Sequence, residues 1–229
     1  IPTGIDCYVT IKLHGTSARS GLIKKETILS KWFSFIKPKY EYFLGTRNLV
    51  LPHKSCNDKY RFLAHEIIKP KLKKDEIIYY EIVGYGQDSK AIMSSHKISD
   101  AKIARKFPDP MFYSYGMKST IENCNPKYEE NFDIYVYRIT EHGVNLSPEK
   151  LEQRCFELGL KTVPFLWKLV WDGEVENLLE KCKLLSELNN GKSRIDSSHI
   201  EEGICLRFYG MPQDENYPAQ MFDMTVKYK

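Results

Sequence analysis

Residues 10–17 of the chain read Thr10-Ile11-Lys12-Leu13-His14-Gly15-Thr16-Ser17. β-Branched and apolar residues dominate this region and predict a strand over residues 5–14 that carries Lys12 near its end. A lysine amine is a nucleophile only in its neutral form, which a partly apolar, positively charged pocket favours. Gly15, three positions later, would let the backbone approach a bound phosphate closely. The stretch indicates a lysine nucleophile on a strand, although a lone strand lysine is more often a surface residue.

Elsewhere in the chain, further segments crowded with β-branched and aromatic residues predict strands, and helices are fewer. Including the strand that carries Lys12, strands are expected at residues 5–14, 76–86, 131–139 and 202–209. The helices are expected from Tyr60 to Pro70, from Pro148 to Gly159 and over about 174–188. Strands that do not alternate strictly with helices predict an α+β fold of mainly antiparallel sheets with flanking helices, in one domain over residues 1–229.

Bulk properties describe a chain that folds without covalent cross-links. With 229 residues and 42% hydrophobic composition, it can bury a full core. The six cysteines are scattered without a C-x-x-C pair, and His53 and Cys56 have only half of a metal-ligand spacing, so neither disulfides nor a zinc site is expected. No apolar stretch reaches the roughly 20 residues of a membrane span. We therefore expect an intracellular, cytoplasmic monomer without a membrane partner.

The charge pattern permits contact with nucleic acid without requiring it. The net charge is +4, which is mildly basic for a chain of this length. One dense run, Lys69-Pro70-Lys71-Leu72-Lys73-Lys74, is either a solvated surface or a track for a phosphate backbone. The abundance of Lys, Ile, Asn and Tyr is typical of an AT-rich genome, as in phages and viruses that act inside a host cell.

Further motifs follow Lys12 along the chain. They are Gly45-Thr46-Arg47-Asn48, Tyr80-Glu81-Ile82-Val83-Gly84, Phe132-Asp133-Ile134-Tyr135-Val136, Glu201-Glu202-Gly203-Ile204-Cys205-Leu206 and Val226-Lys227-Tyr228-Lys229. In this order the set resembles the six-motif signature of covalent nucleotidyltransferases, the superfamily of polynucleotide ligases and RNA capping enzymes. His14 stands where DNA ligases and capping enzymes usually carry aspartate, which resembles the RNA ligase 2 branch. The resemblance runs from residue 12 to the last residue and implies the nucleotidyltransferase (ATP-grasp-like) fold.

The resemblance also implies a set of site residues. The catalytic residues would be Lys12, Arg47, Glu202, Lys227 and Lys229. The nucleotide-binding residues would be Ile11, Lys12, His14, Gly15, Arg47, Glu81, Phe132, Glu202, Lys227 and Lys229. Glu81 would bond the ribose, Phe132 would stack on adenine, and Arg47 would engage a phosphate. The cofactors would be ATP, as AMP bound covalently to Lys12, and magnesium or manganese held near Glu202 mostly through water.

The implied activity is ATP-dependent RNA ligation, which joins a 3′-hydroxyl to a 5′-phosphate through a lysyl-AMP and an adenylylated 5′ end. RNA ends, in a nicked duplex or single-stranded, would be the partners. A DNA ligase, an RNA guanylyltransferase and an inactive nucleotide- or RNA-binding relative are the alternatives. Taken singly, Arg47 is also explained as a surface cation and Phe132 as a core residue. Ligases of this branch usually continue into a smaller nucleic-acid-binding domain. The sequence stops at Lys229, directly after the last motif, so we expect that C-terminal domain to be absent from this chain.

Two positions depart from the family pattern. Many members carry a polar or basic residue that reaches the ribose five positions after the nucleophile; here that position is Ser17, and an arginine stands two further on, at Arg19. Thr10 stands where glutamate is frequent in the RNA ligase 2 branch. Contacts to the ribose and the reading of adenine therefore stay open.

Overall fold

Two compact units make up the computed structural model, and each is described by itself. Unit 1 comprises Ile1–Thr16, Val83–Asp133 and Val163–Lys229, and unit 2 comprises Ser17–Ile82 and Ile134–Thr162. The structure describes residues 1–25, 38–52, 59–85, 92–93, 96–97, 101, 105, 112–113, 132–187, 192–195, 201–209 and 225–228. His53 and Cys56 lie outside these residues. No helix among the described residues is long and apolar enough to cross a membrane.

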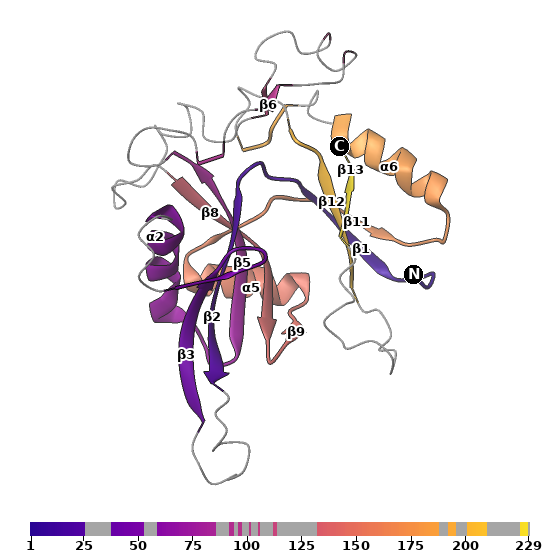
Figure 1. Cartoon of the computed structure of the whole chain (residues 1–229). Coiled ribbons are helices and arrows are strands. Elements are labelled where there is room, and N and C mark those ends of the chain that lie inside the picture. The colour runs from indigo at the N-terminus through magenta and orange to yellow at the C-terminus, as the bar shows by residue number, and fades with distance from the viewer. Residues whose placement is uncertain are drawn as a thin grey trace. The chain divides into compact units, whose positions relative to one another are not determined.

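Unit 1 is built on a four-stranded sheet (Figure 1). In spatial order its strands are β11 (Phe165–Val170), β1 (Asp6–Ile11), β12 (Ile204–Tyr209) and β13 (Thr225–Tyr228). Each neighbouring pair is antiparallel. A short antiparallel pair, β6 (His96–Lys97) and β7 (Phe112–Tyr113), belongs to the same unit. Because β1 is an inner strand, its backbone is hydrogen-bonded on both sides, which fixes the position of the residues that follow it.

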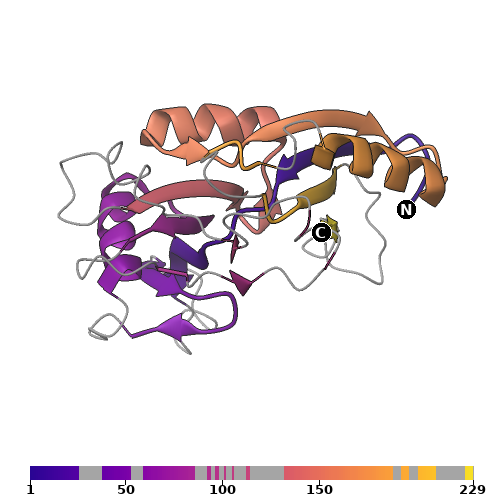
Figure 2. The same ribbon diagram turned by 90° about the horizontal axis from the view of Figure 1, so that it is seen from above.

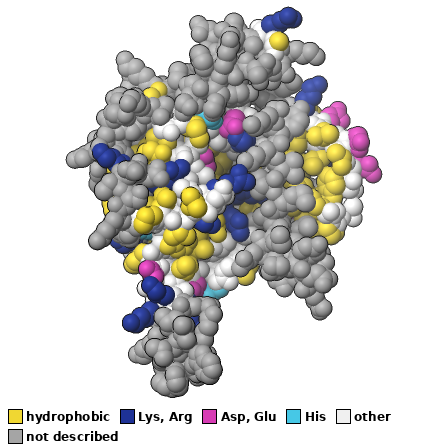
Figure 3. Space-filling view, viewed as in Figure 1, with side chains coloured by type: hydrophobic (Ala, Val, Ile, Leu, Met, Phe, Trp, Pro, Cys, Tyr) yellow, Lys and Arg dark blue, Asp and Glu magenta, His cyan; other side chains and the backbone are white. Residues whose placement is uncertain are grey.

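Helix α6 (Val175–Glu187) packs on one face of this sheet, as Figures 1 and 2 show. The buried cluster consists of Cys7, Val9, Leu169, Cys182, Leu185, Ile204, Leu206 and Phe208, with Leu178 packed against it. Leu178, Cys182 and Leu185 form the inner side of the helix, as their spacing predicts. Burial raises the pKa of the Cys7 thiol to about 12. The outer side carries exposed Val175, Leu179 and Leu184, and Figure 3 shows hydrophobic side chains gathered there.

Unit 2 is built on a seven-stranded sheet. Its strands in spatial order are β10 (Lys161–Thr162), β8 (Phe132–Glu141), β5 (Glu76–Gly84), β2 (Thr16–Lys25), β3 (Lys39–Gly45) and β4 (Val50–Leu51), with β9 (Val144–Asn145) paired to β8. The pairs β2–β3, β3–β4 and β8–β9 are antiparallel, and β10 runs parallel to β8. With the sheet of unit 1, this architecture confirms the predicted α+β class.

Two helices belong to unit 2. Helix α2 (Lys59–Ile68) runs into a short 3-10 turn, η1 (Lys69–Lys71), which contains Pro70. Helix α5 (Pro148–Leu158) begins after Ser147, whose Oγ accepts a hydrogen bond from Lys150 N at 3.4 Å, and it ends at Gly159, whose φ is 68°. Both ends of α5 agree with the sequence, because a serine N-cap before proline and a glycine C-cap are strong local signals.

The first strand is shorter than its sequence predicts. The strand expected over residues 5–14 ends at Ile11, and a second strand, β2, begins at Thr16. Residues 12–15 form the bend between them, with Leu13, His14 and Gly15 buried. Alternation of side chains along a continuous strand would carry every second residue to the opposite face, whereas this bend buries three successive residues. Lys12 is consequently the first residue after the strand.

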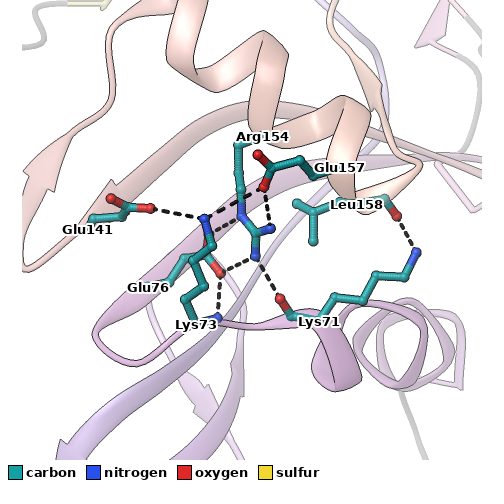
Figure 4. A network of polar contacts seen from close by, with 7 residues as sticks. All are labelled: Lys71, Lys73, Glu76, Glu141, Arg154, Glu157 and Leu158. Atoms are coloured by element: carbon teal, nitrogen blue, oxygen red, sulfur yellow. Dashed lines mark hydrogen bonds and ion pairs between the residues drawn. The ribbon is translucent and has the colours of Figure 1, made fainter.

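A buried arginine fastens α5 to the sheet of unit 2 (Figure 4). Arg154 Nε donates to Glu76 Oε1 at 2.7 Å, its Nη2 donates to Glu76 Oε2 at 3.0 Å, and the Glu76 side chain has no exposed surface. Arg154 also donates to Glu157 Oε2 at 2.9 Å and to the Lys71 carbonyl. Lysines of the basic run take part: Lys71 donates to the Leu158 carbonyl, and Lys73 N donates to Glu76 at 2.8 Å. The side chains of both lysines contact groups of their own unit, because Lys73 Nζ also lies 3.6 Å from Glu157 Oε2.

Candidate functional site

Lys12 stands where β1 ends, and backbone hydrogen bonds fix it there. Ile11 lies opposite Ile204 in the β1–β12 register, and Ile11 N donates to the Pro164 carbonyl at 3.1 Å. Lys12 N donates to the Gly203 carbonyl at 2.7 Å, which extends the pairing by one residue beyond the strand. Gly203 has a φ of 145°, a backbone conformation that favours glycine. The glycine of the Glu201-Glu202-Gly203 motif therefore lets the chain turn beside Lys12.

Lys12 forms an ion pair with Glu202, the residue before that glycine. The two groups contact directly, with exposed side-chain fractions of 13% for Lys12 and 11% for Glu202. His14 Nδ1 lies 3.6 Å from the other carboxylate oxygen of Glu202. Burial opposes ionisation of Glu202, but hydrogen bonds from His14 and Lys12, together with their charges, outweigh burial and lower the pKa of Glu202. The structure thus brings together Lys12, His14 and Glu202 from the predicted site.

The neighbouring glutamate, Glu201, has a different role. It forms an ion pair with Arg194, and Arg194 Nη2 also donates to the Leu185 carbonyl of α6 at 3.2 Å. Burial, only partly offset by Arg194, raises the pKa of Glu201. These contacts hold the segment that carries Glu202 against α6. Sequence reasoning missed Arg194, because it stands alone in an irregular stretch with no motif around it.

The last motif reaches the same sheet through β13. The β12–β13 register pairs Lys227 with Cys205, and the β1–β12 register pairs Cys205 with Thr10, two residues before Lys12. Lys227, Cys205 and Thr10 therefore lie side by side across three neighbouring strands, close to the end of β1. Lys229 lies outside the described residues. Gly15 is buried in the bend and does not have a positive φ.

Arg47 and Glu81 belong to unit 2. Arg47 is exposed at the tip of a tight turn after β3, in which Thr46 N donates to the Leu49 carbonyl at 2.8 Å. Thr46 Oγ1 accepts hydrogen bonds from the backbone of Asn48 at 3.3 Å and Leu49 at 3.1 Å, so the turn is braced by its own threonine. Phe132, the first residue of β8, is grouped with unit 1 and is only 3% exposed.

Glu81 lies on the face of the unit 2 sheet opposite to α2. On the covered face, Ser20 Oγ bonds to Tyr80 OH and to His65 Nδ1 of α2, each at 2.9 Å. Side chains alternate along strands, so Ser17 and Glu81 take the other face. There Ser17 Oγ bonds to Tyr137 OH at 2.9 Å, and the Tyr137 and Tyr79 rings lie 6.5 Å apart. We name Ser17, Arg19, Tyr79, Glu81 and Tyr137 the open face of unit 2.

A divalent metal fits Glu202 only as an ion that keeps most of its water. The described residues contain no group of three or more His, Cys, Asp or Glu side chains that could hold a metal. Magnesium commonly binds proteins through one or two carboxylates and retains several waters. Glu202, whose lowered pKa keeps it ionised at neutral pH, supplies such a carboxylate.

The lowered pKa of Glu202 gives an expected pH dependence of stability. The ionised form stabilises the fold above the ordinary glutamate range, and this contribution is lost as the pH falls through the lowered pKa. We expect Glu202→Gln to be less stable than wild type at neutral pH and the difference to shrink in acid. Urea unfolding of both proteins between pH 7 and pH 3 measures this. Glu201→Gln is the control, because the raised pKa of Glu201 gives the opposite slope; a pH-independent gap for Glu202→Gln would contradict the account.

Comparisons with known proteins identify the family of the chain. A family model described as RNA ligase matches residues 5–228. The structure is similar to Naegleria gruberi RNA ligase: a variant with ATP and Mn gives a TM-score of 0.53 at 14% identity, covering 98% of this chain and 50% of that one. An apo variant gives 0.54 at 14%, covering 98% and 49%, and a variant with AMP and Mn gives 0.51 at 15%, also covering 98% and 49%. A comparison with curated proteins gives no match.

The α+β fold, with a lysine and a glutamate paired at the end of an inner strand, is that of a nucleotidyltransferase domain. The family match spans nearly the whole sequence, and the chain belongs to the RNA ligase family. It spans about half the length of the Naegleria chains that it resembles.

Proposed function

We propose that this chain is the adenylyl-transferring domain of an ATP-dependent RNA ligase and that Lys12 is its nucleophile. The observation that carries the proposal is the contact of Lys12 with Glu202 at the end of β1, beside His14. The RNA ligase family match supports the class of reaction. A variant of the Naegleria ligase has been solved with ATP and Mn, which supports ATP and a divalent metal as the cofactors of this chain.

In the first step, the Lys12 amine attacks the α-phosphorus of ATP. A phosphorus–nitrogen bond forms, the bond to pyrophosphate breaks, and Nζ loses a proton. The ion pair with Glu202 holds Nζ in position, and this pair must separate before the amine attacks. Lys227 and Lys229 offset the charge that develops as pyrophosphate leaves. A divalent metal near Glu202, when bound, would neutralise further phosphate charge.

In the later steps, AMP passes from Lys12 to the RNA. An oxygen of the RNA 5′-phosphate attacks the same phosphorus, and the bond to Lys12 breaks. A 3′-hydroxyl then attacks the activated 5′-phosphate, and AMP leaves. In unit 2, the exposed Arg47 engages the 5′-phosphate and Glu81 bonds the ribose. In unit 1, Phe132 offers a ring to adenine. The proposed substrate is RNA ends, in a nicked duplex or single-stranded. The enzyme would act as a monomer inside the cell.

Labelling with radioactive nucleotide tests the proposal. The chain, incubated with magnesium and ATP labelled at the α-phosphate, is expected to acquire covalent, acid-labile AMP. The same incubation with α-labelled GTP is expected to leave it unlabelled, because the proposed function is ligation and not capping. Label from GTP in preference to ATP would favour guanylyltransferase chemistry, and a folded chain that takes label from neither nucleotide would exclude both.

The substrate is tested by sealing three labelled molecules of the same sequence: nicked duplex RNA, nicked duplex DNA and single-stranded RNA with 5′-phosphate ends. We expect joined product with RNA ends. Sealing of nicked DNA at the rate of nicked RNA or faster would contradict the assignment of RNA as the substrate.

A further inference from the structure

Arg19 has an unusual position on β2. Its Nε is buried, and among the residues that the structure describes the atom has no hydrogen-bond partner. Leaving a buried charged donor without an acceptor costs more stability than a typical hydrogen bond contributes. Such an atom is therefore a candidate to bind something other than the protein's own groups.

Gly45 makes room for this arginine. Arg19 lies opposite Gly45 in the β2–β3 register. A Cβ atom added at Gly45 would lie 2.8 Å from the Leu49 carbonyl oxygen and 2.9 Å from Arg19 Nε, closer than Cβ atoms approach other atoms in proteins. The arginine therefore lies directly over the backbone of Gly45. Gly45 is the residue before the turn that carries Arg47, so both arginines belong to the same end of the β2–β3 pair.

Arg19 also belongs to the open face of unit 2. Ser20 faces α2 through its bonds to His65 and Tyr80, so its neighbour Arg19 faces the other way, with Ser17 and Glu81. Planar guanidinium groups bind phosphate with paired, charge-assisted hydrogen bonds. Arg19 shares its face with Glu81, the proposed ribose-binding residue, and belongs to the same end of the strand pair as the exposed Arg47. This position suits binding of the phosphate of a nucleotide or of an RNA end.

We propose that Arg19 is a phosphate-binding residue, whose guanidinium over Gly45 donates to a terminal phosphate of the substrate. The phosphate comes either from the β- and γ-phosphates of ATP or from the 5′-phosphate of the RNA. This inference rests on the proposed function and adds to it a contact that the family motifs do not supply, because Arg19 stands two residues beyond the usual ribose-contacting position.

Binding measurements distinguish the two sources without requiring catalysis. Four probes are compared by calorimetric titration: α,β-methylene-ATP, AMP, and one oligoribonucleotide with either a 5′-phosphate or a 5′-hydroxyl. If Arg19 binds the phosphates of ATP, we expect Arg19→Met to lower the affinity for α,β-methylene-ATP, but not for AMP, by about ten- to a hundredfold. If it binds the RNA end, we expect the same loss of affinity for 5′-phosphorylated RNA but not for 5′-hydroxyl RNA. Arg19→Lys keeps the charge but lacks the guanidinium geometry, and should recover only part of the affinity.

Lys25→Met is the matched control, because it removes one positive charge from the exposed end of the same strand. It should leave binding of all four probes unchanged, and thermal melting should show every variant folded. Arg19 does not bind a terminal phosphate if Arg19→Met binds all four probes like wild type. The same holds if the variant loses as much affinity for AMP as for α,β-methylene-ATP and as much for 5′-hydroxyl RNA as for 5′-phosphorylated RNA. If the folded wild type binds no nucleotide at all, the proposed function itself fails, and the assignment of Arg19 fails with it.

Discussion

Replacing Arg154 with methionine is expected to lower the free energy of unfolding by about 3–5 kcal/mol, the usual cost of removing one partner of a buried ion pair. Glu76 has no exposed surface and receives two hydrogen bonds from Arg154, at 2.7 and 3.0 Å. Without the guanidinium, a carboxylate would stay buried with the Lys73 backbone N–H as its described donor. Figure 4 shows that the arginine also bridges to the Lys71 carbonyl, so α5 would lose its fastening to the sheet.

Urea unfolding at neutral pH measures this cost. Glu157→Gln is the matched control: Glu157 is 43% exposed, so removal of its ion pair with Arg154 should cost less than about 1 kcal/mol. The double variant Arg154→Met with Glu76→Leu should recover part of the loss, because neither charge then remains buried. An Arg154→Met protein as stable as Glu157→Gln would show that the network does not hold α5.

Local signals in the sequence predict the helices well. Ser147-Pro148 and Gly159 define both ends of α5, and the spacing of Leu178 and Leu185 identifies the buried side of α6. These features depend on residues within a few positions of one another, where helix geometry alone dictates contacts. The class of fold follows from the number of strands and their irregular spacing.

Long-range contacts explain what the sequence could not predict. Arg154 and Glu76 are 78 residues apart, and neither lies in a pattern that marks it as buried. Lys12 N pairs with the carbonyl of Gly203, which is remote in sequence, and the lack of a side chain at Gly45 is explained by the Leu49 carbonyl and by Arg19, which lie too close for a Cβ atom. The order of the motifs assigns Lys12 and Glu202 to one site, but it predicts neither the direct contact between them nor the role of Arg194 beside Glu201.

Substitution of Lys12 should have the largest effect on activity. Lys12→Arg keeps a positive charge opposite Glu202, and so is expected to fold like wild type. An arginine stays protonated and cannot attack the α-phosphorus. We therefore expect covalent labelling with AMP to fall by at least about a thousandfold, the scale seen when a nucleophile is removed. Lys12→Ala should lose labelling equally and should also remove the ion pair between Lys12 and Glu202.

Lys168→Ala is the control for both variants. Lys168 lies on the same sheet and forms an exposed ion pair with Asp6 at 2.8 Å, so its loss removes a comparable group away from the site. Labelling of Lys168→Ala should equal that of wild type. Substantial labelling of a folded Lys12→Arg protein would mean that another residue accepts AMP.

Attachment of AMP to Lys12 can be located directly by mapping the adduct. The wild-type chain is incubated with ATP and magnesium, digested under conditions that preserve the phosphorus–nitrogen bond, and sequenced by mass spectrometry. We expect AMP on Lys12. AMP on any other residue, or a folded chain that binds ATP and carries no covalent AMP, would contradict this assignment.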